Sequence, residues 1–156
     1  MIIIITNSYK CKEQHTIDEF QVFIPYVALD GEIGKKSERV GYCKECNCYF
    51  LNKTQIHNLQ MDFAILCQVI DEKDYLKGTI DEIDVLAKCG YTVKKDRNIN
   101  DTQRQVVLKS IIENGILSKE EVIARLDKQI AQKKTSKQFE NAVSKWELDK
   151  QFCMNM

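Results

Sequence analysis

Four cysteine and histidine residues near the start of the chain constrain its fold more than any other feature. Cys43 and Cys46 form a C-x2-C pair (the knuckle), whose spacing lets two thiolates bind one metal ion at about 2.3 Å. A structural zinc site needs two more ligands, and Cys11 and His15 supply them at C-x3-H spacing. The sequence therefore predicts one structural zinc ion bound by Cys11, His15, Cys43 and Cys46.

Two other residues could act as zinc ligands in place of members of this set. Cys48 could replace Cys46 if the loop between the strands changed its path. His57 could replace His15 if the segment after the knuckle folded back onto it. The spacing alone does not separate these ligand sets.

The remaining cysteines are expected to be ordinary thiols. The chain has seven cysteines, an odd number, and no recognisable secretion signal, which disfavours a disulfide framework and favours a cytoplasmic location. We expect Cys67 and Cys89 to be buried on apolar helix faces and Cys153 to bind no metal. The apolar start, residues 2–5, is too short to span a membrane, so no membrane partner is expected.

The first half of the chain has the patterns of β-strands and the second half those of helices. Asp30 to Gly34 contains two glycines and is typical of a hairpin turn. Capping patterns at Thr79/Glu82 and Ser118/Glu121, and a capping Asp101, mark helix starts. Strands are predicted at residues 2–5, 20–29, 38–42 and 48–51, and helices at 54–70, 79–90, 101–115, 118–131 and 139–152, with a polar linker at 132–138.

These patterns predict an α+β fold with segregated elements. Residues 1–53 should form a small antiparallel β zinc-binding module, similar to a zinc ribbon or treble clef. Residues 54–156 should form a mostly helical module. With 44% hydrophobic and 29% charged residues, the composition is that of an ordered globular protein.

Four segments carry a resemblance. They are the strand–knuckle–strand run 42–50, Gly90-Tyr91-Thr92-Val93, Arg104-Gln105, and the ending Lys145-Trp146-x-x-Asp149-x-x-Phe152. With these segments the chain resembles a scattered group of bacterial zinc-finger-plus-helices proteins. The resemblance covers most of the chain and implies the metal and the two-part layout, but no activity.

No catalytic site is predicted. Four protein ligands would close the zinc ion to the water that a hydrolytic zinc site needs. The zinc deaminase signature fails, because Thr16 and Ile17 follow His15. A divergent metal-dependent nuclease is a remote alternative, since it would need a free histidine on a strand and only His57, at an expected helix start, remains.

Nucleic acid is the second choice of partner. The 23 basic and 23 acidic residues balance, which disfavours a nucleic-acid-binding protein. A helix-turn-helix-like segment around Gly115 would set Glu120 and Glu121 against phosphates. A nucleic-acid-binding regulator is still the alternative, because zinc knuckles occur in RNA binders and a basic run could contact phosphates: Arg125, Lys128, Lys133, Lys134 and Lys137.

A protein partner is favoured over nucleic acid. The apolar stripe of the last helix, Phe139, Trp146 and Phe152, suits docking on another protein or on a second copy, and Trp146 is expected to be partly exposed. The competing hypothesis is that the stripe packs into the core of the chain itself. We therefore expect a non-catalytic, zinc-stabilised accessory or regulatory protein that binds another macromolecule.

Overall fold

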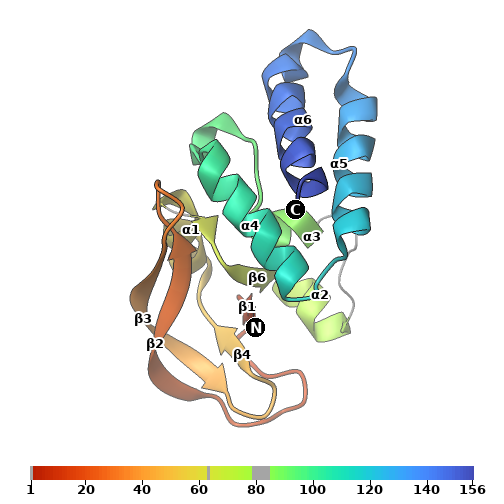
Figure 1. Cartoon of the computed structure of the whole chain (residues 1–156). Coiled ribbons are helices and arrows are strands. Elements are labelled where there is room, and N and C mark those ends of the chain that lie inside the picture. Colours follow the sequence, from red (N-terminus) through yellow and green to blue (C-terminus); the bar gives the residue numbers. More distant parts are fainter. Residues whose placement is uncertain (1, 63, 79–84) are drawn as a thin grey trace.

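A computed structural model describes residues 2–62, 64–78 and 85–156. They form one six-stranded sheet with helices around it, so the α+β class predicted from the sequence is confirmed (Figure 1). The strands are β1 (Ile3–Thr6), β2 (Asp18–Val27), β3 (Ile33–Cys43), β4 (Cys48–Phe50), β5 (Ala64–Ile65) and β6 (Cys67–Ile70). The helices are α1 (Lys53–Asp62), α2 (Glu72–Lys77), α3 (Val85–Lys88), α4 (Asp101–Glu113), α5 (Lys119–Lys133) and α6 (Glu140–Met154), with short 3₁₀ helices η2 (Lys95–Arg97) and η3 (Lys137–Phe139).

The sheet is mixed rather than antiparallel as predicted. Its strand order is β5-β2-β3-β4-β1-β6. β2 and β3 form the predicted hairpin, with Asp18 opposite Tyr42, and Gly31 in its turn has φ 89°, a value that favours glycine. β1 is parallel to both β4 and β6. An uninterrupted isoleucine run suits such a strand, which is paired on both sides and covered on both faces.

The helix predicted at residues 54–70 is wrong beyond residue 62. α1 ends at Asp62, and the chain then forms the two short strands β5 and β6. The apolar run at 64–70 fits a buried strand as well as a helix, and pairing with β2 and β1 decides the outcome. The sheet therefore takes two strands from beyond the module boundary predicted at residue 53.

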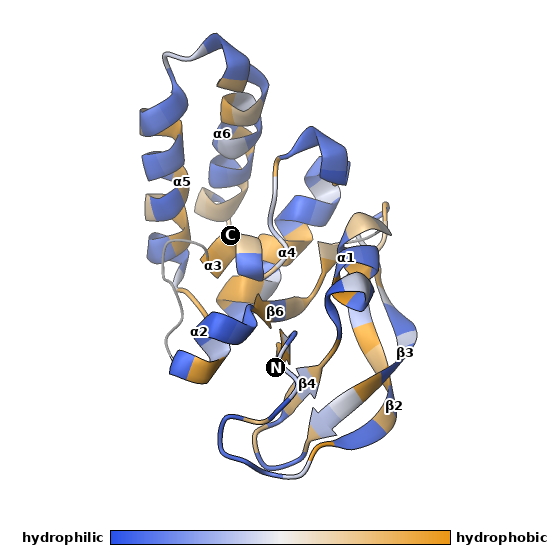
Figure 2. Cartoon of the chain, turned by 180° about the vertical axis from the view of Figure 1, so that it is seen from behind, coloured by the Kyte–Doolittle hydropathy of each residue, from blue (hydrophilic) through white to orange (hydrophobic). Residues whose placement is uncertain are grey.

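Each face of the sheet builds its own core. Neighbouring residues of a strand point to opposite faces, and β5 shows this with Ala64 and Ile65. Ile65 packs in a cluster with Leu59 of α1, whereas Ala64 belongs to the cluster of Leu108 on α4. The sheet is therefore covered by α1 on one face and by α4 and the other C-terminal helices on the opposite face (Figures 1 and 2).

The C-terminal helices follow the local start signals of the sequence closely. Ser118 and Glu121 form the predicted capping box of α5. The cap of α4 is Asn100, in a capping box with Gln103, so the predicted cap at Asp101 is displaced by one residue. The predicted capping pattern at Thr79 and Glu82 lies outside the described residues. α5 and α6 lie side by side as a hairpin, and the predicted linker shortens to residues 134–136 (Figure 1).

The stripe of α6 packs into the core of the chain itself. Trp146 is only 8% exposed, so the prediction of a partly exposed tryptophan is wrong. Phe139 and Phe152 are half-buried against the same cluster. The reason is that α6 lies against both α5 and α4, which cover its apolar face. Among the described residues, no helix has the length and apolar character needed to cross a membrane.

A buried ion pair joins α4 to α6. Arg104 Nε donates to Asp149 Oδ2 at 2.7 Å, and both side chains are fully buried. Tyr91 Oη donates to the same oxygen at 2.7 Å, and Arg104 Nη1 donates to the carbonyl of Ile99 at 3.2 Å. Burial, and then the Asp149 carboxylate, raise the pKa of Tyr91, so its hydroxyl stays a donor. The network fixes the segment before α4 against the last helix.

We predict that Asp149→Ala costs about 3–5 kcal/mol of unfolding free energy, because it removes the buried partner of Arg104 and leaves this buried charge with only the exposed Asp101 as an acidic partner. Urea denaturation followed by circular dichroism measures this loss. The matched control is Glu147→Ala on the exposed side of the same helix, which should change stability by less than about 0.5 kcal/mol. Equal effects of the two changes would refute the structural role of the pair.

Candidate metal centre

The four predicted ligands come from two loops at one end of the β2–β3 hairpin. Cys11 and His15 lie in the loop between β1 and β2, and Cys43 and Cys46 lie at the end of β3 and in the turn that follows. Because Asp18 pairs with Tyr42, the segment just before β2 is held beside the end of β3. The hairpin thus carries the chain out and returns it to the same point.

The donor atoms of these four residues, the metal cluster, lie within 4.8 Å of one another. Cys11 Sγ is 3.8 Å from Cys43 Sγ and 3.5 Å from Cys46 Sγ. His15 Nδ1 is 3.7 Å, 3.6 Å and 3.3 Å from the sulfurs of Cys11, Cys43 and Cys46. Metal–sulfur bonds of about 2.3 Å and metal–nitrogen bonds of about 2.0 Å separate tetrahedral ligands by about 3.5–3.8 Å. The metal cluster therefore could bind one metal ion.

The backbone of both loops adopts unusual conformations beside the ligands. Gln14 has φ 60° and Asn47 has φ 51°, the left-handed region that residues other than glycine seldom adopt. The amide of Gln14 donates to the carbonyl of Cys11 at 3.0 Å, and Tyr42 Oη donates to Asn47 Oδ1 at 2.8 Å. Strained backbone persists where the surroundings fix it, and it clusters at functional sites. The two turns thus hold the ligands at a conformational cost.

The thiols of the metal cluster differ in how readily they ionise. Burial alone would raise the pKa of Cys11, but hydrogen bonds from the backbone of Glu13 and His15 outweigh it and hold that pKa at about 6. Burial, and then the neighbouring Cys11 and Cys43, raise the pKa of Cys46 to about 12. A bound cation would reverse the repulsion among the thiolates, because it lowers the pKa of every thiol that binds it.

The loop that carries Cys11 is fastened to α2. The amide of Lys12 donates to Tyr75 Oη at 3.0 Å, and Tyr75 is buried in a cluster with Cys11 and Cys43. Asn7 accepts from the amide of Glu72 at 2.7 Å at the start of the same helix. The metal cluster is therefore tied to an element outside the β-strands that flank it.

The rival ligands lie outside the metal cluster. Among the described residues, the group of convergent donors contains neither Cys48 nor His57. Cys48 is buried on β4, where burial, and then Cys11 and Cys43, raise its pKa to about 12. His57 is exposed on α1.

The three remaining cysteines, Cys67, Cys89 and Cys153, are all buried. Cys67 lies on β6, not on a helix as predicted, and Cys89 lies just after α3. Cys153 is fully buried on α6. Burial raises the pKa of each of these thiols, to about 12 for Cys89 and about 11 for Cys153, so all three stay uncharged. They therefore pack as small hydrophobic side chains of the core.

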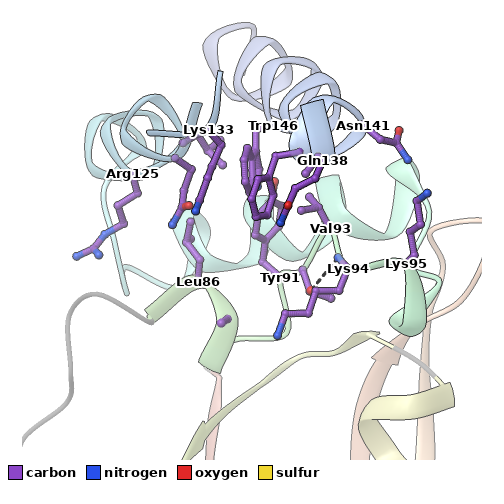
Figure 3. A pocket seen from close by; sticks show the side chains of 16 residues that line it. Leu86, Tyr91, Val93, Lys94, Lys95, Arg125, Lys133, Gln138, Asn141 and Trp146 are labelled. Carbon is purple, nitrogen blue, oxygen red and sulfur yellow. Dashed lines mark hydrogen bonds between the residues drawn. The ribbon is translucent and has the colours of Figure 1, made fainter. Parts of the chain in front are cut away.

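Some of the other predicted binding residues line a cavity of about 570 Å³, and the rest lie outside it (Figure 3). Phe139 and Trp146, predicted for a protein partner, line it together with Arg125 and Lys133, predicted for nucleic acid. Lining residues that sequence reasoning missed are Lys94 and Lys95, whose only signal is a basic doublet after Tyr91-Thr92-Val93. Four predicted residues are outside the lining: Lys128, Lys134, Lys137 and Phe152.

We predict that Cys43→Ser abolishes metal binding, whereas Cys48→Ser, at the position paired with it across β3 and β4, leaves binding intact. Elemental analysis of protein purified without added metal should find about one ion per chain in the parent and in Cys48→Ser. Amide exchange should show lost protection around residues 11–15 and 43–46 in Cys43→Ser, because metal binding at such a site contributes to folding. Full metal content in both variants would show that the ligand set is wrong.

Comparison of the chain with family models, curated proteins and solved structures finds no match. The resemblance to bacterial zinc-finger-plus-helices proteins therefore stays a prediction.

Proposed function

We propose that this chain is a non-catalytic binding protein whose β-strands are stabilised by one structural zinc ion. The observation that carries the proposal is the metal cluster, with three thiols and one imidazole at tetrahedral separations. Soft thiolates with an imidazole suit zinc, whereas oxygen ligands would suit magnesium or calcium. The position of the cluster at the end of the β2–β3 hairpin also supports the zinc-ribbon-like architecture expected from the sequence.

A structural role for the zinc ion is favoured over a catalytic one. Four protein ligands complete a tetrahedral shell, and a catalytic zinc ion keeps one position for water or substrate. Glu45 is an exposed acid beside the cluster, and its carboxylate lies 3.4 Å from His15 Nδ1. With the shell closed, that carboxylate has no metal-bound water to activate. The remaining histidine of the chain, His57, lies on α1 outside the cluster.

Binding of a protein partner is favoured over reading of DNA. α4 and α5 flank the turn at Gly115 as a helix-turn-helix would, but the first turn of α5 presents the exposed acids Glu120 and Glu121. Acids there stabilise the helix start and would repel phosphates. The nucleic-acid alternative is favoured by the basic side chains around the cavity and by the occurrence of zinc knuckles in RNA binders. Seven free thiols are consistent with a reducing, cytoplasmic setting.

The test is affinity capture from the extract of the native cell on the zinc-loaded chain, with retained proteins and nucleic acids both analysed. We predict that a specific protein is retained and that its binding falls only modestly as salt is raised, because apolar contacts are weakly screened and exposed ion pairs add little. Retention of nucleic acid that is lost steeply with salt would favour the alternative. Absence of any specific retained macromolecule would refute the binding function.

A further inference from the structure

The cavity of about 570 Å³ lies between the α5–α6 hairpin and the segment 91–95 (Figure 3). Its apolar lining includes Trp146 and Leu126 from the hairpin, and Tyr91 and Leu86 from the opposite wall. Its volume is in the range of ligand-binding clefts, about 300–1,000 Å³, which typically combine apolar walls with a few polar groups. A cavity of this size accommodates more than one side chain of a bound molecule.

The charged residues that line the described cavity are all basic. Lys94, Lys95, Arg125 and Lys133 line it, and none of the described lining residues is Asp or Glu. The chain as a whole has equal numbers of basic and acidic residues, so this gathering is local. Lys94 and Lys95 come from one wall, and Arg125 and Lys133 from α5 on the other. Cations on both walls favour a bound group that carries carboxylates or phosphates.

The neutral polar side chains of the cavity favour a polypeptide over a nucleic acid as the bound molecule. Gln129, Gln138 and Asn141 line the cavity, and each amide offers both hydrogen-bond donors and an acceptor. A peptide backbone needs both, because every residue except proline carries one N–H and one C=O. A phosphate group only accepts, so the amide oxygens could bind no phosphate of a nucleic acid, only its bases or sugars.

The aromatic residues of the cavity offer little surface for stacking bases. Trp146 is 8% exposed, so its ring faces are largely covered by the protein itself. The Lys133 ammonium lies 4.4 Å from the centroid of the Phe139 ring and covers one face of it. Single-stranded nucleic acids are held by bases that stack on open aromatic faces. The cavity therefore suits apolar side chains entering between the walls better than stacked bases.

We propose that this cavity docks a short segment of a partner protein in which an aromatic or aliphatic side chain is flanked by Asp or Glu. The apolar side chain enters between Leu86 on one wall and Phe139 at the hairpin, which are only half-buried, and the carboxylates pair with the lysines of the rim. This inference rests on the proposed binding function and names the chemistry of the partner.

Two variants alter the cavity, and each has a matched control. Lys94→Glu with Lys95→Glu reverses the charge of one wall, and Lys128→Glu with Lys134→Glu makes the same change at exposed positions outside it. Ala87→Trp fills the cavity from α3, and Ala124→Trp places the same side chain on an exposed part of α5. All substituted residues are exposed, so folding should be retained, and thermal melts check this.

The experiment selects peptides from a displayed random library on the zinc-loaded full chain and measures affinities by fluorescence anisotropy. Selected peptides should combine acidic with aromatic or aliphatic residues. Both cavity variants should weaken their binding by about tenfold or more, and both controls by less than about twofold. Selected peptides without acids, or with affinities that the cavity variants leave unchanged, would overturn the proposal. The proposal would also be overturned if an oligothymidine bound the chain and lost affinity in the Lys94→Glu/Lys95→Glu variant as the peptides are expected to do.

The same variants separate this proposal from the proposed function. If the protein captured from the extract stays bound to Lys94→Glu/Lys95→Glu and to Ala87→Trp, the binding function stands and the cavity proposal fails. If the extract yields no specific partner, the binding function itself is refuted.

Discussion

The convergence of three thiols and one imidazole is the constraint on which the β part of this protein depends. The two loops that carry them contain strained residues at Gln14 and Asn47, and their small cluster of buried residues includes Cys11 and Cys43 themselves. Without a cation, burial and then the neighbouring Cys11 and Cys43 raise the pKa of Cys46, so that its ionisation is opposed. One metal ion would replace this repulsion with four bonds. It would then fix the ends of the β2–β3 hairpin to each other.

The helical part depends on a second polar interaction, the buried pair of Arg104 and Asp149. Tyr91 donates to the same carboxylate and also lines the cavity, and Trp146 lies one turn before Asp149 on α6. The two walls of the cavity are therefore joined to each other through a hydrogen bond in the core. Preorganisation of this kind favours binding, because the ordering of the site does not have to accompany association. The fold thus places a cavity lined by basic residues on a part of the molecule distinct from the metal cluster.

Local spacing made some features predictable from the sequence. The ligand pairs at positions 11 and 15 and at 43 and 46, the glycine hairpin turn, and the capping box of Ser118 and Glu121 each involve residues close in the chain. Features set by long-range packing were missed. Strand pairing overrode helical periodicity at residues 64–70, and contact with α4 and α5 buried Trp146. The cavity combines residues about fifty positions apart, so no local pattern could place Lys94 beside Trp146.

X-ray absorption at the zinc edge tests the central claim most directly, because it measures the ligand shell of the metal without any variant. The metal cluster predicts three sulfur atoms at about 2.3 Å and one nitrogen atom at about 2.0 Å, with no vacant position. A shell of four sulfurs would mean that Cys48 binds in place of His15. A shell with oxygen from water would contradict a closed structural site, and with it the assignment of a non-catalytic role.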